Sequence, residues 1–127
     1  MTSLTKKRFL VVDDEPAIRK LLSGILSEAG HDVDMAENGR HALQMLSKNS
    51  YDLIISDVNM PEMDGIIFYL AILENFPEMR KRILFVTGGL TNEVVAFFKK
   101  YGCKYIAKPN LFNESGLLDQ IKCMLDK

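Results

Sequence analysis

Five short runs of aliphatic and β-branched residues alternate with longer segments in which apolar side chains recur at helical spacing. The short runs span residues 9–12, 32–36, 53–56, 83–86 and 105–107. Such alternation is typical of βαβ units, in which helices cover both faces of a parallel sheet. The run at 32–36 is the least apolar, as expected for a strand at the edge of a sheet. The pattern predicts an α/β fold with a doubly wound, five-stranded parallel sheet and five helices.

Capping residues delimit the predicted helices. The first helix begins at Pro16, which is favourable in a first turn, and ends at Gly30. Side chains that can accept hydrogen bonds from a first helical turn precede the next three helices, at Asn38, Asp64 and Thr91. Further boundaries are Pro77 after the third helix and Gly102 after the fourth, and an apolar stripe from Leu117 to Leu125 marks the fifth.

Length and composition are those of one globular unit. The chain has 127 residues, of which 47% are hydrophobic and 26% are charged, and it contains no repeat or low-complexity tract. We therefore expect a single domain over residues 1–127. A chain of this size builds a core without a metal or disulfide staple, so a metal site would serve function. Cys103 and Cys123 lack the spacing of a zinc or redox motif.

Net charge and hydropathy exclude several classes of function. The formal net charge is -1, so no overall field attracts the chain to nucleic acid or to an anionic membrane. Basic residues 6–8 precede an apolar run that ends at Val12, too short for a signal peptide, and no run reaches the ~18 apolar residues of a membrane-spanning helix. We expect a cytoplasmic protein that binds neither nucleic acid nor membrane directly.

Candidate chemistry gathers at the carboxyl ends of the predicted strands, where ligands bind in open parallel sheets. The residues there are Asp13, Asp14, Asp57, Thr87 with Gly88, and Lys108. Crowded carboxylates repel one another unless a cation is present, and an all-oxygen site without His or Cys favours Mg²⁺. One carboxylate could then attack phosphorus, while the lysine ammonium, the threonine hydroxyl and the Gly88 N–H receive the phosphoryl oxygens.

These residues, together with the segment 57–65 and the pair Lys108-Pro109, resemble the receiver domain of two-component response regulators across nearly the whole chain. The resemblance implies strand order 2-1-3-4-5 in a flavodoxin-like fold. It also implies phosphorylation of Asp57 by a histidine kinase or a histidine phosphotransfer protein. Asp14, Asp57 and the backbone carbonyl of Asn59 would hold Mg²⁺, with Asp13 acting through water, and the Lys108-Pro109 bond would be cis.

The resemblance also implies a switch. Tyr105 stands where receivers carry an aromatic residue whose burial accompanies phosphorylation, although a core tyrosine needs no such role. The excess of apolar residues at 94–98 suggests a docking margin, or else a broad core contact. A downstream protein, or a phosphorylation-dependent second copy, would bind the fourth helix, fifth strand and fifth helix. Residues 68–69, 77 and 86–89 further resemble receivers tethered to hybrid histidine kinases.

Two alternatives belong to other functional classes. The first is a receiver fold that serves only as a docking module, but such a module has no need of Asp14, Asp57, Thr87 and Lys108. The second is a magnesium-dependent phosphohydrolase, which would need an aspartate two residues after the nucleophile, where this chain has Asn59. A calcium loop starting at Asp57 is rejected because its sixth position is Glu62 instead of glycine. Taken alone, Asp13-Asp14 could simply cap a helix.

Overall fold

A five-stranded parallel sheet forms the centre of the computed structural model, which describes residues 6–60, 63–89, 91–107 and 114–125. Every strand pairing is parallel and the strand order is β2-β1-β3-β4-β5. The strands are β1 (Arg8–Val12), β2 (Asp32–Ala36), β3 (Leu53–Asp57), β4 (Ile83–Thr87) and β5 (Lys104–Ala107). The predicted fold class and the strand order implied by the resemblance are both confirmed.

Five α-helices connect and follow the strands, as predicted. They are α1 (Pro16–Glu28), α2 (Gly39–Leu46), α3 (Gly65–Asn75), α4 (Asn92–Tyr101) and α5 (Glu114–Leu125). A short 3₁₀ helix, η1 (Pro77–Met79), lies between α3 and β4 and was not predicted. No helix in the described ranges is long and apolar enough to cross a membrane.

The predicted caps explain where three helices begin. The side chains of Asn38, Asp64 and Thr91 accept hydrogen bonds from the first-turn N–H groups of α2, α3 and α4, respectively. Each bond satisfies a donor that the helix itself cannot pair. At the other end of α4, Gly102 has φ of 68°, a left-handed conformation that stops the helix at little steric cost.

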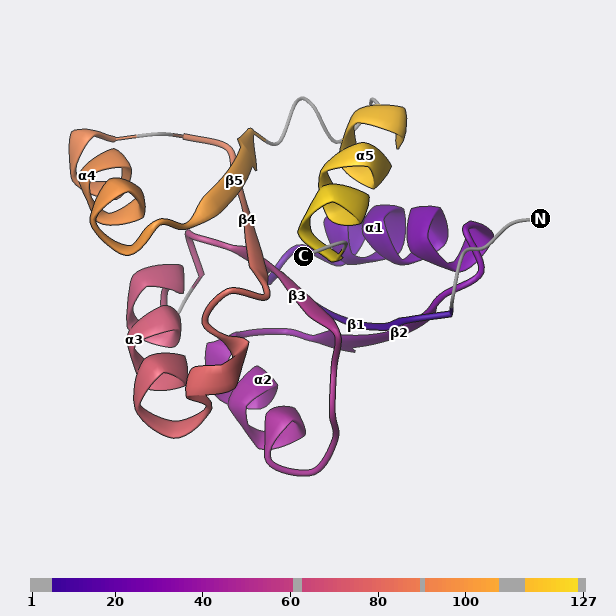
Figure 1. Ribbon diagram of the computed structural model, residues 1–127, viewed down its shortest axis with the longest axis horizontal. Coiled ribbons are helices and arrows are strands. Elements are labelled where there is room, and N and C mark those ends of the chain that lie inside the picture. The colour runs from indigo at the N-terminus through magenta and orange to yellow at the C-terminus, as the bar shows by residue number, and fades with distance from the viewer. Residues whose placement is uncertain (1–5, 61–62, 90, 108–113, 126–127) are drawn as a thin grey trace.

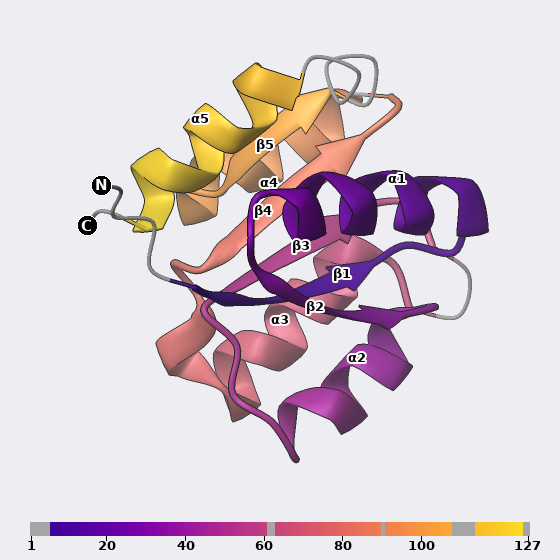
Figure 2. The ribbon, with the colours of Figure 1, turned by 90° about the vertical axis from the view of Figure 1, so that its right-hand side faces the viewer.

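The sheet separates two hydrophobic layers because alternate strand residues face opposite sides. Residues Leu10, Ile54 and Phe85 pack on the side of α2, α3 and α4. Their neighbours Val11, Ile55 and Leu84 pack on the side of α1 and α5. Figures 1 and 2 show α1 and α5 together on one face and α2 and α3 on the other. Burial on both faces accounts for the continuous apolar runs in the sequence.

The third helix approaches the end of β3 too closely for any side chain at its first residue. The Gly65 N–H donates to the carbonyl oxygen of Val58 at 2.7 Å. A Cβ atom at Gly65 would lie 2.8 Å from the Val58 Cα and 2.9 Å from the Asp57 carbonyl oxygen. Both are backbone atoms, so relief would require movement of the chain that carries Asp57.

We predict that Gly65→Ala lowers the free energy of unfolding by about 1–3 kcal/mol, because the added methyl group overpacks against backbone. Gly24→Ala is the matched control, since Gly24 is an exposed position within α1 and its Cβ would meet nothing within 4 Å. Because alanine forms helices better than glycine does, Gly24→Ala should raise the free energy of unfolding by about 0.5–1 kcal/mol. Urea unfolding measures both variants, and equal effects would contradict the close approach.

Candidate functional site

Strand register brings two carboxylates together at the carboxyl edge of the sheet. Val12, the last residue of β1, pairs with Ser56 of β3, so the residues that follow them, Asp13 and Asp57, stand at the same level of the sheet. Their exposed fractions are only 0% and 2%. Two acids this deeply buried at adjacent strand ends are costly unless their charges are compensated, which marks the position as a candidate functional site.

Two exposed acids extend this pair into a cluster. Asp13, Asp14, Glu15 and Asp57 each offer a carboxylate oxygen, and these oxygens all lie within 4.8 Å of one another. The structure therefore brings together the three predicted acids. It adds Glu15, which sequence reasoning did not propose, although Glu15 directly continues the acidic run that begins at Asp13.

Backbone donors orient the buried carboxylates. The Glu15 N–H donates to Asp13 Oδ1 at 2.9 Å, and the Asn59 N–H donates to Asp57 Oδ1 at 3.2 Å. The guanidinium of Arg19 donates to the Asp13 carbonyl oxygen at 2.7 Å. Asn59, whose carbonyl the sequence proposed as a metal ligand, thus also holds the Asp57 side chain. A donor set made only of carboxylates, with no His or Cys, suits a hard divalent cation such as Mg²⁺.

Thr87, the last residue of β4, is almost fully buried, with an exposed fraction of 1%. Its hydroxyl donates to the Gly89 carbonyl oxygen at 2.9 Å and accepts from the Gly89 N–H at 3.2 Å. Gly88 lies between them on the exposed loop that follows the strand. The hydroxyl is therefore engaged by its own loop, in a small turn that the sequence did not reveal.

Of the two remaining predicted residues, Tyr105 is among the described residues and Lys108 is not. Tyr105 lies on the edge strand β5 with 42% of its surface exposed, and its ring stacks on Phe98 of α4 with centroids 4.7 Å apart. The tyrosine is thus outside the core. Lys108 and Pro109 lie outside the described residues, and with them the expected phosphoryl contact and the expected cis bond.

Comparison with known proteins identifies the family. The family model described as "Response regulator receiver domain" matches residues 9–122 of the chain. The chain therefore belongs to the receiver domains of two-component response regulators, and its place is in phosphorelay signalling, as the resemblance implied. Nothing in the comparisons supports a magnesium-dependent phosphohydrolase, or a docking module that phosphorylation does not regulate.

Individual relatives agree with the family. The chain is 33% identical over 117 residues to the two-component response regulator ARR11 of Arabidopsis thaliana, covering 89% of this chain and 22% of that protein. Among solved structures, the chemotaxis protein CheY4 of Vibrio cholerae has a TM-score of 0.82 at 35% identity. The match covers 95% of this chain and 100% of the CheY4 chain. Response regulator TrrA of Thermotoga maritima, in complex with Mg²⁺-BeF, has a TM-score of 0.79 at 34% identity, with coverage of 94% and 99%. This chain spans about a fifth of the length of ARR11 and of other curated relatives.

Crowding of the acids predicts that Asp14→Asn stabilises the protein when no divalent cation is present. The substitution keeps the size of the side chain and removes one of the like charges that repel one another. We expect a higher midpoint of thermal unfolding in a buffer containing EDTA. Asp119→Asn, which removes an exposed carboxylate from α5, controls for the change in net charge. A lower midpoint for Asp14→Asn, relative to wild type and this control, would contradict repulsion within the cluster.

Proposed function

We propose that Asp57 accepts a phosphoryl group from a phosphohistidine of a histidine kinase or histidine phosphotransfer protein. One observation carries the proposal: the buried Asp57 carboxylate belongs to a cluster of four acids whose oxygens lie within 4.8 Å of one another. Membership of the receiver family supports the same reading. A buried carboxylate is a nucleophile that forms an acyl phosphate, provided that the surrounding negative charge is neutralised.

In the proposed transfer, an Asp57 Oδ atom forms a bond to phosphorus as the bond from phosphorus to the donor imidazole nitrogen breaks. The imidazole keeps that electron pair, and the product is an aspartyl phosphate that water later hydrolyses. The chain therefore catalyses only its own phosphorylation and dephosphorylation and turns over no external metabolite. The hydrogen bond from the Asn59 N–H to Asp57 Oδ1 fixes one oxygen and supports attack by the other.

Mg²⁺ is the proposed cofactor, held by Asp14, Asp57 and the Asn59 carbonyl, with Asp13 acting through water. When bound, it would neutralise carboxylate charge and so favour the approach of an anionic phosphoryl group. The carboxylate-only cluster fits this role, and the solved structure of TrrA is a complex that contains Mg²⁺. Glu15 adds a fourth carboxylate and hence further negative charge at the exposed side of the cluster.

The remaining site residues would read out the new charge. Lys108 pairs with one phosphoryl oxygen, while the Thr87 hydroxyl and the Gly88 N–H donate to another. To do so, Thr87 must give up its bond to the Gly89 carbonyl. Movement of Thr87 toward the phosphoryl group opens room in which the exposed ring of Tyr105 can turn inward.

We place the output surface on α4, β5 and α5, where a downstream protein or a second phosphorylated copy would dock. The domain is proposed to comprise residues 1–127, to act in the cytoplasm and to bind neither nucleic acid nor membrane itself. A receiver attached to a hybrid histidine kinase remains the proposed subtype, from residues 68–69, 77 and 86–89.

Two of the apolar side chains of α4, Phe97 and Val95, differ in what they contact. Phe97 packs against Tyr69 of α3, with ring centroids 5.7 Å apart, and against Tyr101 at 4.8 Å. Burial raises the pKa of the Tyr69 phenol to about 12, in agreement with its enclosed position in this aromatic cluster. Phe97 thus contributes to a core contact. Val95 is partly buried like Phe97, but among the described residues it is not one of those packed against either hydrophobic cluster, so it is the better candidate for a docking contact.

Phosphorylation of Asp57 is tested by intact-mass measurement after incubation with acetyl phosphate and Mg²⁺. Wild type should gain one phosphoryl group, whereas Asp57→Ala should gain none because it lacks the nucleophile. Asp14→Asn should react more slowly and need more Mg²⁺, since it reduces the ligand charge. Asp119→Ala, a loss of an exposed acid from α5, should react like wild type. Equal labelling of Asp57→Ala would assign the phosphoryl group to another residue.

The output surface is tested with Val95→Ser and Phe97→Ala. Val95→Ser should leave phosphorylation and stability intact but weaken phosphorylation-dependent self-association, measured by sedimentation with and without phosphodonor. Phe97→Ala should lower the free energy of unfolding by about 1–3 kcal/mol, because it removes ring contacts from a partly buried site. A comparable loss of stability in Val95→Ser would place Val95 in the core and remove it from the surface.

A further inference from the structure

A cavity lies at the opposite edge of the sheet from Asp57, and nothing in the proposed phosphoryl chemistry uses it. It has a volume of about 310 Å³ and is formed by the end of α2 with its following loop, the end of α3, η1 and the residue before β4. Leu46, Phe76 and Met79 supply its apolar surface, and Asn49, Glu78 and Arg82 supply polar groups. This size is at the lower end of the range for small-molecule sites, ~300–1,000 Å³.

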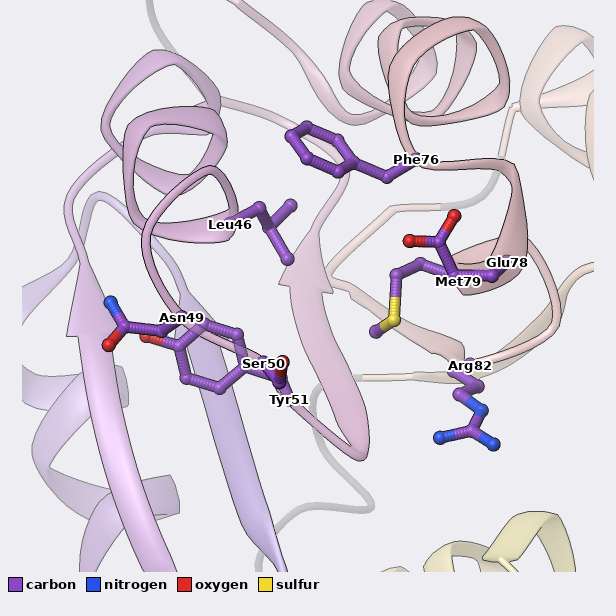
Figure 3. Close-up of a pocket in the computed structure, with 8 residues that line it drawn as sticks. All are labelled: Leu46, Asn49, Ser50, Tyr51, Phe76, Glu78, Met79 and Arg82. Carbon is purple, nitrogen blue, oxygen red and sulfur yellow. The ribbon is translucent and has the colours of Figure 1, made fainter.

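One wall of the cavity is held in place by a hydrogen-bond network. The phenol of Tyr51 donates to Asp34 Oδ2 at 2.6 Å, and the Arg8 guanidinium donates to the same oxygen at 2.8 Å. Arg8 also donates to Asn49 Oδ1 at 3.3 Å and lies over the Tyr51 ring. Figure 3 shows Asn49 and Tyr51 side by side on this wall, with Leu46 between them and Phe76. A preorganised wall lowers the entropic cost of binding.

One cation and one acid line the cavity. They are Arg82 and Glu78, the two residues of the lining with a formal charge, so the lining has no net charge. Arg82 is exposed, and in the described part of the chain its side chain has no hydrogen bond or ion pair. In Figure 3 the Glu78 carboxylate lies beside Met79 toward Phe76, whereas the Arg82 guanidinium lies at the other end.

We propose that this cavity binds a small carboxylate with an apolar body. The apolar part lies against Leu46, Phe76 and Met79, and the carboxylate pairs with the Arg82 guanidinium at the end remote from Glu78. Arginine suits this role because its planar donors match both carboxylate oxygens. The strand β3 separates the cavity from Asp57, so the two sites can be occupied independently.

Three probes of the same shape and different charge test the proposal: hydrocinnamate, its neutral amide, and phenylpropylamine. Their binding is followed through the methyl resonances of Leu46 and Met79 in the NMR spectrum of the whole chain. Hydrocinnamate should shift both residues saturably, with a dissociation constant of about 1 mM or below. The amide and the amine should bind at least about fivefold more weakly than hydrocinnamate, because they lose the ion pair with Arg82.

Matched variants separate a specific site from general attraction to a basic surface. Arg82→Gln should weaken hydrocinnamate binding about fivefold, whereas Lys81→Gln, an equal loss of charge outside the lining, should change it less than about twofold. Ser50→Phe, at an exposed position of the lining, should fill the cavity and abolish binding without any change in charge. Thermal unfolding of each variant verifies that it is folded.

Three results would overturn the proposal. The first is the absence of a saturable shift at Leu46 and Met79. The second is equal binding of all three probes, or an equal loss in Lys81→Gln and Arg82→Gln, which would indicate non-specific association. The third is undiminished binding in folded Ser50→Phe, which would move the site elsewhere. Failure of acetyl phosphate to label Asp57 would leave these outcomes unchanged, so the two proposals stand or fall separately.

Discussion

Parallel pairing of β1 with β3 is the constraint on which the site depends. The register that aligns Val12 with Ser56 also sets Asp13 beside Asp57, at a depth where solvent cannot screen them. Burial of two like charges opposes folding, and the apolar contacts on both faces of the central strands offset it. The same arrangement creates a strong local demand for positive charge. Stability of the fold and affinity for a cation are therefore linked through one pair of strands.

Rigidity around Asp57 comes from backbone, with side chains in a supporting role. The Gly65 N–H is bonded to the Val58 carbonyl, and α3 begins in direct contact with the end of β3. The Asn59 N–H, two residues after Asp57, also holds one carboxylate oxygen. A nucleophile fixed in this way loses little entropy when it reacts. The loop after β4, by contrast, carries two adjacent glycines, which impose little restriction on backbone movement.

Features with a local cause could be predicted from the sequence. The strands follow from short apolar runs, and the helix starts at Asn38, Asp64 and Thr91 follow from side chains that accept first-turn hydrogen bonds. Strand order has no such local signal and came from the family resemblance. The position of Phe97 against Tyr69 and the bond between Thr87 and Gly89 depend on tertiary packing and on rotamers, so periodicity could not reveal them. Participation of Glu15 in the cluster required the path of the chain after β1.

The closed turn at Thr87 has a thermodynamic consequence for signalling. Because its hydroxyl already has an acceptor in Gly89, a phosphoryl group bound by Thr87 would gain only the difference between two hydrogen bonds. Individual hydrogen bonds contribute ~0.5–1.5 kcal/mol, so their difference is about 1 kcal/mol or less, and this residue alone would change the ratio of two conformations by about fivefold at most. Under the proposed mechanism, the unphosphorylated protein then samples the active arrangement in a measurable minority of molecules. A partner present at high concentration could draw on that minority, which makes the output graded in partner abundance as well as in phosphorylation.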